Sequence, residues 1–173
     1  MTVTIGYGAV MMEAVELSVV VPAHNEEGNV RPLVEEIVAA VDPCCDSFEI
    51  IVADDASTDG TLAALKELQA TEPRLRILHL PPPPKGGGNG QSAAFKAAFS
   101  ACRGPIVAVL DADLQNNPAD LPAMLELLRT SGADFIQGDR SASRADGAIR
   151  RLSSWVGRSF RRLLLGDSIK DTG

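Results

Sequence analysis

The sequence predicts an α/β protein in which helices flank a mainly parallel central sheet. Short runs rich in Val and Ile alternate along the chain with longer segments rich in Ala and Leu, which is typical of βαβ units. Polar residues gather directly after several of these runs, at the strand ends where an open parallel sheet binds its ligands. The length of 173 residues suits one ordinary domain. We therefore expect one α/β domain with its site at the carboxyl ends of the strands.

Five strands are expected where a short apolar run is bounded by turn residues. The first, LSVVV, is expected to end at Pro22, because proline has no backbone N–H to donate to a neighbouring strand. The fourth leads directly into the segment LDADLQNNP. The five expected strands comprise residues 17–21, 48–53, 75–80, 106–110 and 133–138.

Helices are expected where apolar residues recur at intervals of three and four. The helix from residue 118 begins with proline, which the first turn of a helix accommodates. The loop PPPPKGGGNG, residues 81–90, is expected to contain no regular structure because of its prolines and glycines. The expected helices comprise residues 29–41, 59–70, 91–102, 118–130 and 146–165.

The domain is expected to span residues 17–173, after an N-terminal extension of residues 1–16. No apolar run approaches the roughly 18 to 20 residues that cross a membrane, and no basic segment leads into a signal-like apolar core. The three cysteines form no CxxC pattern, and Cys44 and Cys45 are adjacent. We therefore expect a reducing, cytoplasmic compartment and no zinc site.

Charge is distributed unevenly along the chain. Residues 1–139 contain 20 Asp and Glu against 8 Lys and Arg, whereas residues 140–173 contain 3 Asp against 8 Lys and Arg. The basic end either binds an anionic partner, such as phosphate or a lipid headgroup, or forms a solvated helix face. The expected helix 146–165 either lies on an anionic membrane or packs its apolar side on the sheet.

Two carboxylates, Asp111 and Asp113, stand one residue apart after the fourth strand. Such a pair is common in ordinary turns, and a structural turn is one interpretation. In the other, alternate residues leaving a strand point the same way, so the two carboxylates share a hard divalent cation that also recruits phosphate oxygens. Gln115 could then add a neutral oxygen ligand.

The turns after the first two strands carry further polar residues. In the segment DDASTDG, Asp59 or a neighbour caps the next helix, or Asp55 accepts a hydrogen bond from a base or ribose hydroxyl. His24 is either a turn residue or a ligand contact, and no second histidine stands at metal-ligand spacing. The segment KGGGNGQ is either a phosphate cradle or a flexible lid or linker, and it lacks the GxxxxGK[ST] pattern.

Taken in order, these segments resemble the family 2 glycosyltransferases, which have a GT-A fold. The greatest resemblance is to the polyprenyl-phosphate glycosyltransferases, meaning dolichol-phosphate mannose synthase and its bacterial undecaprenyl-phosphate relatives. It covers about residues 17–173. The segments that carry it are SVVVPAHNEEGNV, FEIIVADDASTDGT, GQSAAFKAAF, GPIVAVLDADLQNNP, GDR and RRLSS.

The resemblance implies a role for particular residues. Asp111, Asp113 and Arg140 would be catalytic, and Asp113 with Gln115 would hold Mg2+ or Mn2+. Arg140 and Arg150, the first residue of an RxxxS element that ends at Ser154, would grip phosphates. His24 stands where the family often has tyrosine. The nucleotide sugar would be bound by Pro22, His24, Glu26, Ala53, Asp55, Asp111, Ala112, Asp113, Arg140 and Arg150.

The implied activity is transfer of a sugar, with inversion, from a GDP- or UDP-linked donor to dolichyl or undecaprenyl phosphate. The reaction would take place at the cytoplasmic face of a membrane, with possible membrane-surface contact and without nucleic acid. One alternative is a family 2 transferase with a saccharide or protein hydroxyl acceptor. Another is a donor-binding fragment without transferase activity, because the family sequence normally continues beyond Gly173. A phosphoacceptor receiver domain and a DxD phosphatase are excluded because they place their acidic residues after different strands.

Overall fold

The computed structural model describes residues 14–138 of the chain. Two compact units are distinguished, Met1–Glu126 and Leu127–Gly173, and the sheet belongs to the first. Arg140, Arg150, Ser154 and the expected helix 146–165 lie outside the described residues.

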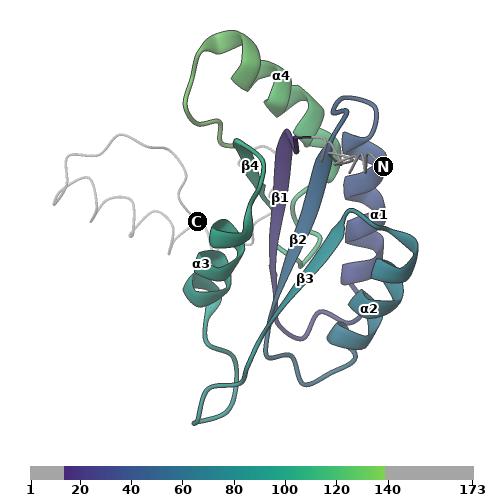
Figure 1. The fold of residues 1–173 in the computed structure, drawn as a ribbon, viewed down its shortest axis with the longest axis vertical. Helices are drawn as coiled ribbons and strands as arrows, with labels where there is room; N and C mark the ends of the chain where they lie inside the picture. Colours follow the sequence, from purple (N-terminus) through teal and green to yellow (C-terminus); the bar gives the residue numbers. More distant parts are fainter. Residues whose placement is uncertain (1–13, 139–173) are drawn as a thin grey trace, which may run out of the picture. The chain divides into compact units, whose positions relative to one another are not determined.

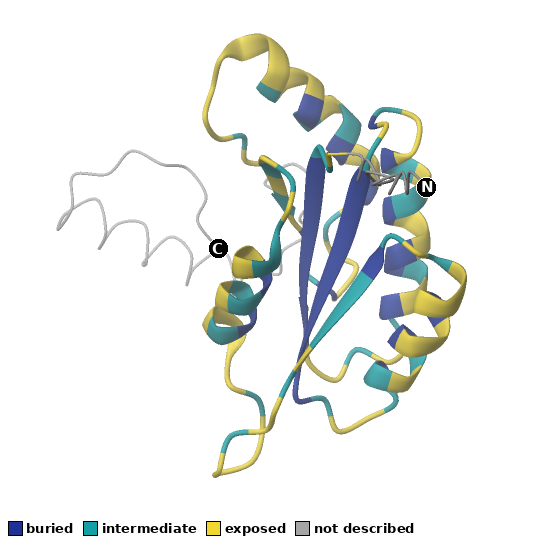
Figure 2. Ribbon diagram, viewed as in Figure 1, coloured by how far each residue is buried: buried dark blue, intermediate teal, exposed yellow. Residues whose placement is uncertain are grey.

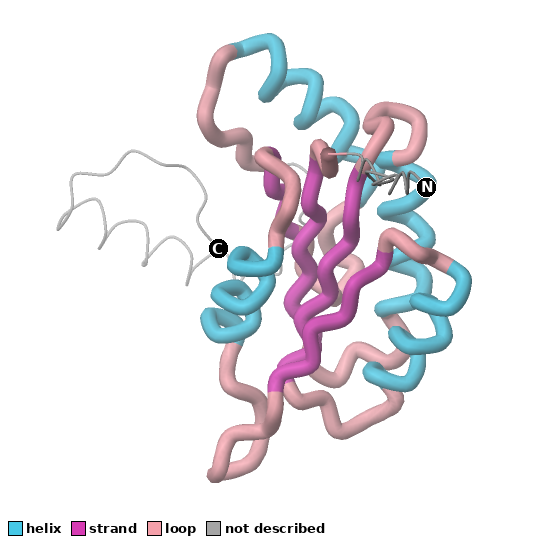
Figure 3. The backbone as a smooth tube through the Cα atoms, viewed as in Figure 1, coloured by secondary structure: helices cyan, strands magenta, loops and turns pink. Residues whose placement is uncertain are grey.

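The first unit is built on four parallel strands in the order β3-β2-β1-β4 (Figures 1 and 3). Every residue of β1 and β2 is buried, because these two central strands have neighbours on both edges and helices on both faces. This explains why they appear in the sequence as continuous apolar runs. The strands are β1 Leu17–Ala23, β2 Phe48–Asp55, β3 Leu75–Leu80 and β4 Ile106–Val109.

Helices cover both faces of the sheet (Figures 1 and 2). Val19 and Val21 of β1 point to the face covered by α1, Val30–Val41, and α2, Thr61–Thr71. Val20 points to the opposite face, where Ala94 and Ala98 of α3, Gln91–Ala101, complete a second small core. The short helix η1, Pro118–Asp120, precedes α4, Leu121–Ser131, as the proline at residue 118 predicted.

The first strand continues through Pro22, where the sequence predicted its end. The carbonyl oxygen of Val20 accepts the N–H of Leu110 at 3.0 Å, so alternate residues of β1 direct their hydrogen-bonding groups toward β4. The backbone nitrogen of Pro22 faces the same side as the hydrogen-bonding groups of Val20, but the pairing with β4 stops at Val109. Proline therefore costs no ladder hydrogen bond at this position, and pairing with β2 continues to Asp54.

The expected fifth strand, residues 133–138, does not form. Residues 132–138 contain no strand, and Phe135 is 75% exposed. The segment has only two large apolar side chains. It also has no hydrogen-bonded partner strand among residues 14–138, and an isolated strand is not stable in water. Along residues 14–138, no helix has the length and apolar character needed to cross a bilayer.

Candidate functional site

Polar residues meet at the edge of the sheet where β1, β2 and β4 end. Because β1 lies between the other two and all three are parallel, their following turns are neighbours. Each turn contains one non-glycine residue with a positive φ angle: Asn25 at 58°, Ala56 at 55° and Leu114 at 59°. Among residues 14–138 no other non-glycine residue has a positive φ. Such conformations cost about 1–2 kcal/mol for residues with a side chain and tend to gather at functional sites.

The ring of His24 joins the first two turns, and its neighbours determine its tautomer. Nδ1 lies 2.6 Å from the backbone carbonyl oxygen of Asp55, which can only accept, so Nδ1 carries a proton. Nε2 lies 3.2 Å from Nδ2 of Asn25. The Oδ1 atom of Asn25 accepts the N–H of Thr58 at 2.8 Å, which fixes Nδ2 toward the ring. Nε2 is therefore an acceptor, and the arrangement fits a neutral imidazole.

Side chains of the second turn also hold the backbone of the first. Two hydroxyls and one carboxylate of the second turn accept hydrogen bonds from three consecutive backbone N–H groups of the first turn. Asp59 supplies that carboxylate, so these contacts favour a structural role for Asp59. The contacts are Asn25 N to Ser57 Oγ at 2.9 Å, Glu26 N to Thr61 Oγ1 at 2.8 Å, and Glu27 N to Asp59 Oδ2 at 3.2 Å. Asp59 supports the start of α2 as well, because its Oδ1 accepts the N–H of Thr61 at 3.0 Å.

The two carboxylates of the Asp54–Asp55 doublet have separate environments. Asp54 is fully buried, and its Oδ2 atom lies 2.6 Å from Nδ1 of His79 on β3. Its Oδ1 atom accepts the N–H of Ser57 at 3.2 Å. Asp54 therefore serves the fold by joining two strand ends, and Asp55 is the member of the doublet that faces the pocket.

Asp55 is bound by the loop between β3 and α3. Its Oδ1 atom accepts the backbone N–H of Asn89 at 2.7 Å and the side-chain Nδ2 at 2.9 Å, and its Oδ2 atom accepts the N–H of Gly90 at 2.7 Å. Burial alone would raise the pKa of this carboxyl, but the hydrogen bonds from Asn89 and Gly90 outweigh it, so the pKa lies below its usual range. Asp55 is therefore ionised at neutral pH.

The same contacts argue against the interpretation of the glycine loop as a phosphate cradle. The N–H groups of Asn89 and Gly90 point to the Asp55 carboxylate and are not available to a phosphate. Gly88 lies so close that a Cβ atom there would stand 2.5 Å from Oδ2 of Asp55. The end of the loop therefore anchors the start of α3.

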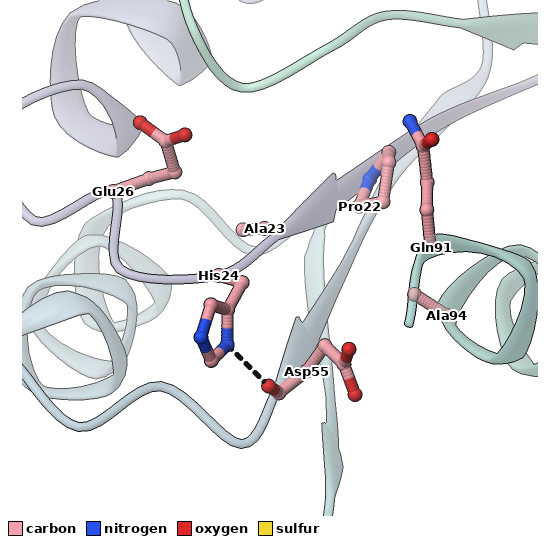
Figure 4. Close-up of a pocket in the computed structure, with 7 residues that line it drawn as sticks. All are labelled: Pro22, Ala23, His24, Glu26, Asp55, Gln91 and Ala94. Atoms are coloured by element: carbon pink, nitrogen blue, oxygen red, sulfur yellow. Dashed lines mark hydrogen bonds between the residues drawn. The ribbon is translucent and has the colours of Figure 1, made fainter. Parts of the chain in front are cut away.

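A pocket opens between the first two turns and the start of α3 (Figure 4). Four of its residues were predicted from the sequence, whereas Ala23, Gln91 and Ala94 were not. Gln91 follows the glycine loop as the first residue of a helix, which is the sequence signal that could have identified it. Ala53, predicted to contact the nucleotide, is fully buried and does not line the pocket. The lining consists of Pro22, Ala23, His24, Glu26, Asp55, Gln91 and Ala94.

The acidic pair lies beyond the end of β4 at Val109, and Asp113 is part of a turn. Oδ1 of Asp111 accepts Nε2 of Gln91 at 3.3 Å, and Oδ2 accepts Nδ2 of Asn116 at 3.2 Å. Oδ1 of Asp113 accepts the N–H of Gln115 at 3.0 Å. Ala112 between them is buried, whereas Asp113 is exposed.

The chemistry of this turn fits a hard divalent cation. Within residues 14–138, no Lys, Arg or His forms a salt bridge with Asp111 or Asp113. The same residues contain no group of three or more His, Cys, Asp or Glu side chains that could hold a metal ion. Two carboxylates with an amide oxygen suit a cation such as Mg2+, which binds proteins through one or two carboxylates and takes further oxygens from substrate phosphates and water.

Comparison with known proteins gives consistent matches. A family model described as Glycosyl transferase family 2 matches residues 18–171. The chain is 37% identical over 164 residues to dodecaprenyl-phosphate galacturonate synthase of Rhizobium johnstonii. That match covers 94% of the chain and 47% of the relative, so the chain spans about half the length of this curated relative.

Two solved structures are also similar. A mannosyltransferase from Pyrobaculum calidifontis, in complex with GDP-Man and Mn2+, superposes with a TM-score of 0.56 at 28% identity. This match covers 65% of the chain and 32% of the neighbour. A glucosyl-3-phosphoglycerate synthase from Mycobacterium tuberculosis, in complex with Mn2+, UDP and phosphoglyceric acid, has a TM-score of 0.58 at 27% identity. It covers 86% of the chain and 49% of that structure.

Proposed function

The chain belongs to glycosyl transferase family 2 and has a GT-A fold, and we propose that it transfers a sugar from a nucleoside diphosphate to a polyprenyl phosphate. The donor class is supported by the two structural neighbours, whose complexes contain GDP-Man or UDP. The acceptor class is supported by the name of the Rhizobium relative, a dodecaprenyl-phosphate galacturonate synthase.

One observation carries the proposal: the pocket and the acidic pair lie on one sheet edge and share Gln91. This residue lines the pocket and also donates to Asp111 at 3.3 Å. A nucleoside in the pocket would therefore have its diphosphate beside Asp111 and Asp113. A nucleoside diphosphate has this order of groups, with a neutral base and ribose at one end and charged phosphates at the other.

Different residues would contact different parts of the proposed donor. Pro22, His24, Glu26 and Asp55 would contact the nucleoside, with the ionised Asp55 accepting from a base or ribose donor. Asp111 would orient the donor sugar or the water shell of the metal. Arg140 and Arg150, outside the described residues, would neutralise phosphate charge.

Asp113 and Gln115 would hold Mg2+ or Mn2+. When bound, the cation would stabilise the negative charge of the departing nucleoside diphosphate. The oxygen-rich donor set of the turn and the Mn2+ in both neighbouring complexes support this assignment.

The proposed chemistry is a single displacement. A phosphate oxygen of the acceptor would form a bond to the anomeric carbon while the bond from that carbon to the diphosphate breaks, and the diphosphate would leave with the electron pair. Attack from the opposite side inverts the anomeric centre. Because a phosphate monoester is ionised at neutral pH, its oxygen needs no strong general base. The lipid acceptor also implies reaction at a membrane surface.

The test is a two-stage measurement on the purified chain. Calorimetry with UDP, GDP and their sugar derivatives, with and without Mn2+, would detect donor binding. Radiolabel transfer would then compare polyprenyl phosphate with a saccharide acceptor. Transfer to the lipid phosphate supports the proposal, whereas transfer to the saccharide alone identifies a different acceptor class. Binding without any transfer would identify a donor-binding unit, and absence of nucleotide binding would contradict the donor site itself.

A further inference from the structure

Asp111 is held between two amide groups that come from different parts of the chain. Nε2 of Gln91 reaches Oδ1 from the start of α3, and Nδ2 of Asn116 reaches Oδ2 from the turn after β4. One neutral donor therefore binds each carboxylate oxygen. Neutral donors fix the orientation of a carboxylate without cancelling its charge, so the remaining acceptor positions stay available to a ligand.

The Gln91 side chain starts from a backbone position that is itself held. The two preceding residues, Asn89 and Gly90, donate their backbone N–H groups to the buried Asp55 carboxylate, each at 2.7 Å. Hydrogen bonds to a charged acceptor are stronger than those between neutral groups. Nδ2 of Asn89 adds a contact to the carbonyl oxygen of Pro81 at 2.9 Å, which ties the start of the loop to its end.

Three consecutive residues thus connect the two ends of the site. Asp55, after β2, binds residues 89 and 90, and Asp111, after β4, binds residue 91. Figure 4 shows Gln91 at the start of α3 and Asp55 at the end of β2, and both residues line the pocket. Any movement of this segment would change both the pocket lining and the orientation of Asp111.

From these contacts we propose that Gln91 is a positioning residue that orients the Asp111 carboxylate, and that Asp55 and Asn89 hold Gln91 in place. The inference rests on the proposed donor site and adds a residue that acts through Asp111. Gln91 couples occupancy of the nucleoside pocket to the diphosphate and metal end of the site.

A double-mutant cycle separates this role from direct contact with the ligand. UDP affinity in the presence of Mn2+ would be measured by calorimetry for wild type, Gln91→Ala, Asp111→Ala and the double variant, with thermal unfolding to confirm that each is folded. Ser92→Ala is the matched control, because Ser92 is exposed and one residue further along the same helix. GDP would be run in parallel in case the pocket selects guanosine.

We expect Gln91→Ala to weaken Mn2+-dependent binding about tenfold, as for loss of one hydrogen bond to a charged group. In the Asp111→Ala background the same change should alter affinity by less than about twofold, since the group through which Gln91 acts is gone. Ser92→Ala should bind as wild type does. Asn89→Ala, which removes the side-chain contacts to Asp55 and Pro81, should lower Mn2+-dependent affinity in the same direction.

The electron paramagnetic resonance spectrum of bound Mn2+ provides a readout that a merely structural role would not change. Gln91→Glu, which replaces the donor by a negative charge, should alter the spectrum, and Ser92→Ala should leave it unchanged. Additive losses in the cycle, or an unchanged Gln91→Ala affinity, would overturn the inference while leaving the donor site intact. If wild type binds neither nucleotide, the proposed function fails and the inference falls with it.

Discussion

Nδ1 of His24 lies 2.6 Å from the backbone carbonyl oxygen of Asp55, and this contact joins the turn after β1 to the turn after β2. Both residues line the pocket. The ring is therefore one of the contacts that hold the two turns together, and its other nitrogen is occupied by Asn25. A side chain without a donor at this position would leave the carbonyl oxygen without this hydrogen bond.

Replacement of His24 by alanine should weaken nucleotide binding because the two turns would lose the side-chain contact between them that lies at the pocket. Loss of one hydrogen bond of this kind costs about 1 kcal/mol, which corresponds to roughly a fivefold to tenfold loss of affinity. Calorimetric titration with UDP and GDP would measure the effect. Lys66→Gln, at an exposed position on α2, is the control. Equal affinities for His24→Ala and Lys66→Gln would show that the ring has no part in binding.

Removal of the exposed carboxylate in the acidic turn should abolish the metal-dependent part of nucleotide binding. Asp113 forms no salt bridge with a basic residue among residues 14–138, so Asp113→Ala removes a proposed oxygen ligand without breaking an ion pair there. Affinity for UDP should become the same with and without Mn2+. Asp120→Ala is the matched control, an exposed aspartate from η1 that follows in the same loop. A preserved Mn2+ effect in Asp113→Ala would refute the assignment of this ligand.

The parts of the fold that the sequence predicted correctly are those fixed by burial along one element. β1 and β2 are buried on both faces, so their apolar runs identified them without knowledge of their partners. The expected strand 133–138 was wrong because a strand also needs a neighbour with which to pair. The end of β1 was placed too early because the effect of Pro22 depends on where β4 stops.

The site shows the same division between local and distant information. The polar turns were located correctly because they follow strand ends in sequence. The contacts of Asp55 with Asn89 and of Asp111 with Gln91 join residues separated by 34 and 20 positions, respectively. No local pattern identifies such pairs, since they depend on the path of the glycine loop. Substitutions of Asn89 or Gln91 therefore test contacts that the sequence did not reveal.

Away from the site, an ion pair between a buried glutamate and a half-buried arginine fixes the opposite end of the sheet. Glu49 of β2 is 3% exposed, and its carboxylate accepts Ser18 Oγ at 2.7 Å and Arg76 Nη1 at 2.5 Å. Glu49→Gln places an amide N–H2 group beside the Ser18 and Arg76 groups that donate to the carboxylate. It also leaves the charge of Arg76 without its partner. We expect the free energy of unfolding to fall by about 3 kcal/mol. Urea denaturation would measure it, and a loss below about 1 kcal/mol would contradict the argument.

Stability should also decrease in acid because of the same carboxylate. Burial would raise the pKa of Glu49, but hydrogen bonds from Ser18, Arg76 and Arg103 outweigh it, and the pKa is lowered overall. The unfolded chain therefore binds a proton at a higher pH than the folded chain does. The stabilisation is complete above the ordinary glutamate pKa of about 4.3 and is lost as pH falls through the lowered folded value.

Urea denaturation from pH 7 to pH 3 would check this dependence. The wild type should lose stability below about pH 4.5, and Glu49→Gln should show a smaller decline because its residue 49 does not titrate. Asp55, whose pKa is also lowered, contributes to the decline that remains in the variant. Parallel curves for wild type and Glu49→Gln would show that Glu49 does not cause the acid sensitivity.

The left-handed conformation of Leu114 leads to different expectations for stability and for binding. Its φ angle of 59° is unfavourable for a leucine, and the residue is 37% exposed, so the rest of its surface is buried. Leu114→Gly should change the free energy of unfolding by no more than about 1 kcal/mol, because relief of the strain at positive φ offsets the lost burial. Leu114→Val should lower it by at least about 1 kcal/mol, because a β-branched residue tolerates this region least.

Binding should respond to Leu114→Gly more strongly than stability does. Leu114 stands between Asp113 and Gln115, and a glycine there allows the turn to adopt other conformations. Mn2+-dependent affinity for nucleotide should therefore fall even though the stability of the fold changes little. Urea denaturation and calorimetry on the same preparation would measure both quantities. If Leu114→Gly loses stability and keeps its affinity, the strained turn serves the fold and not the site.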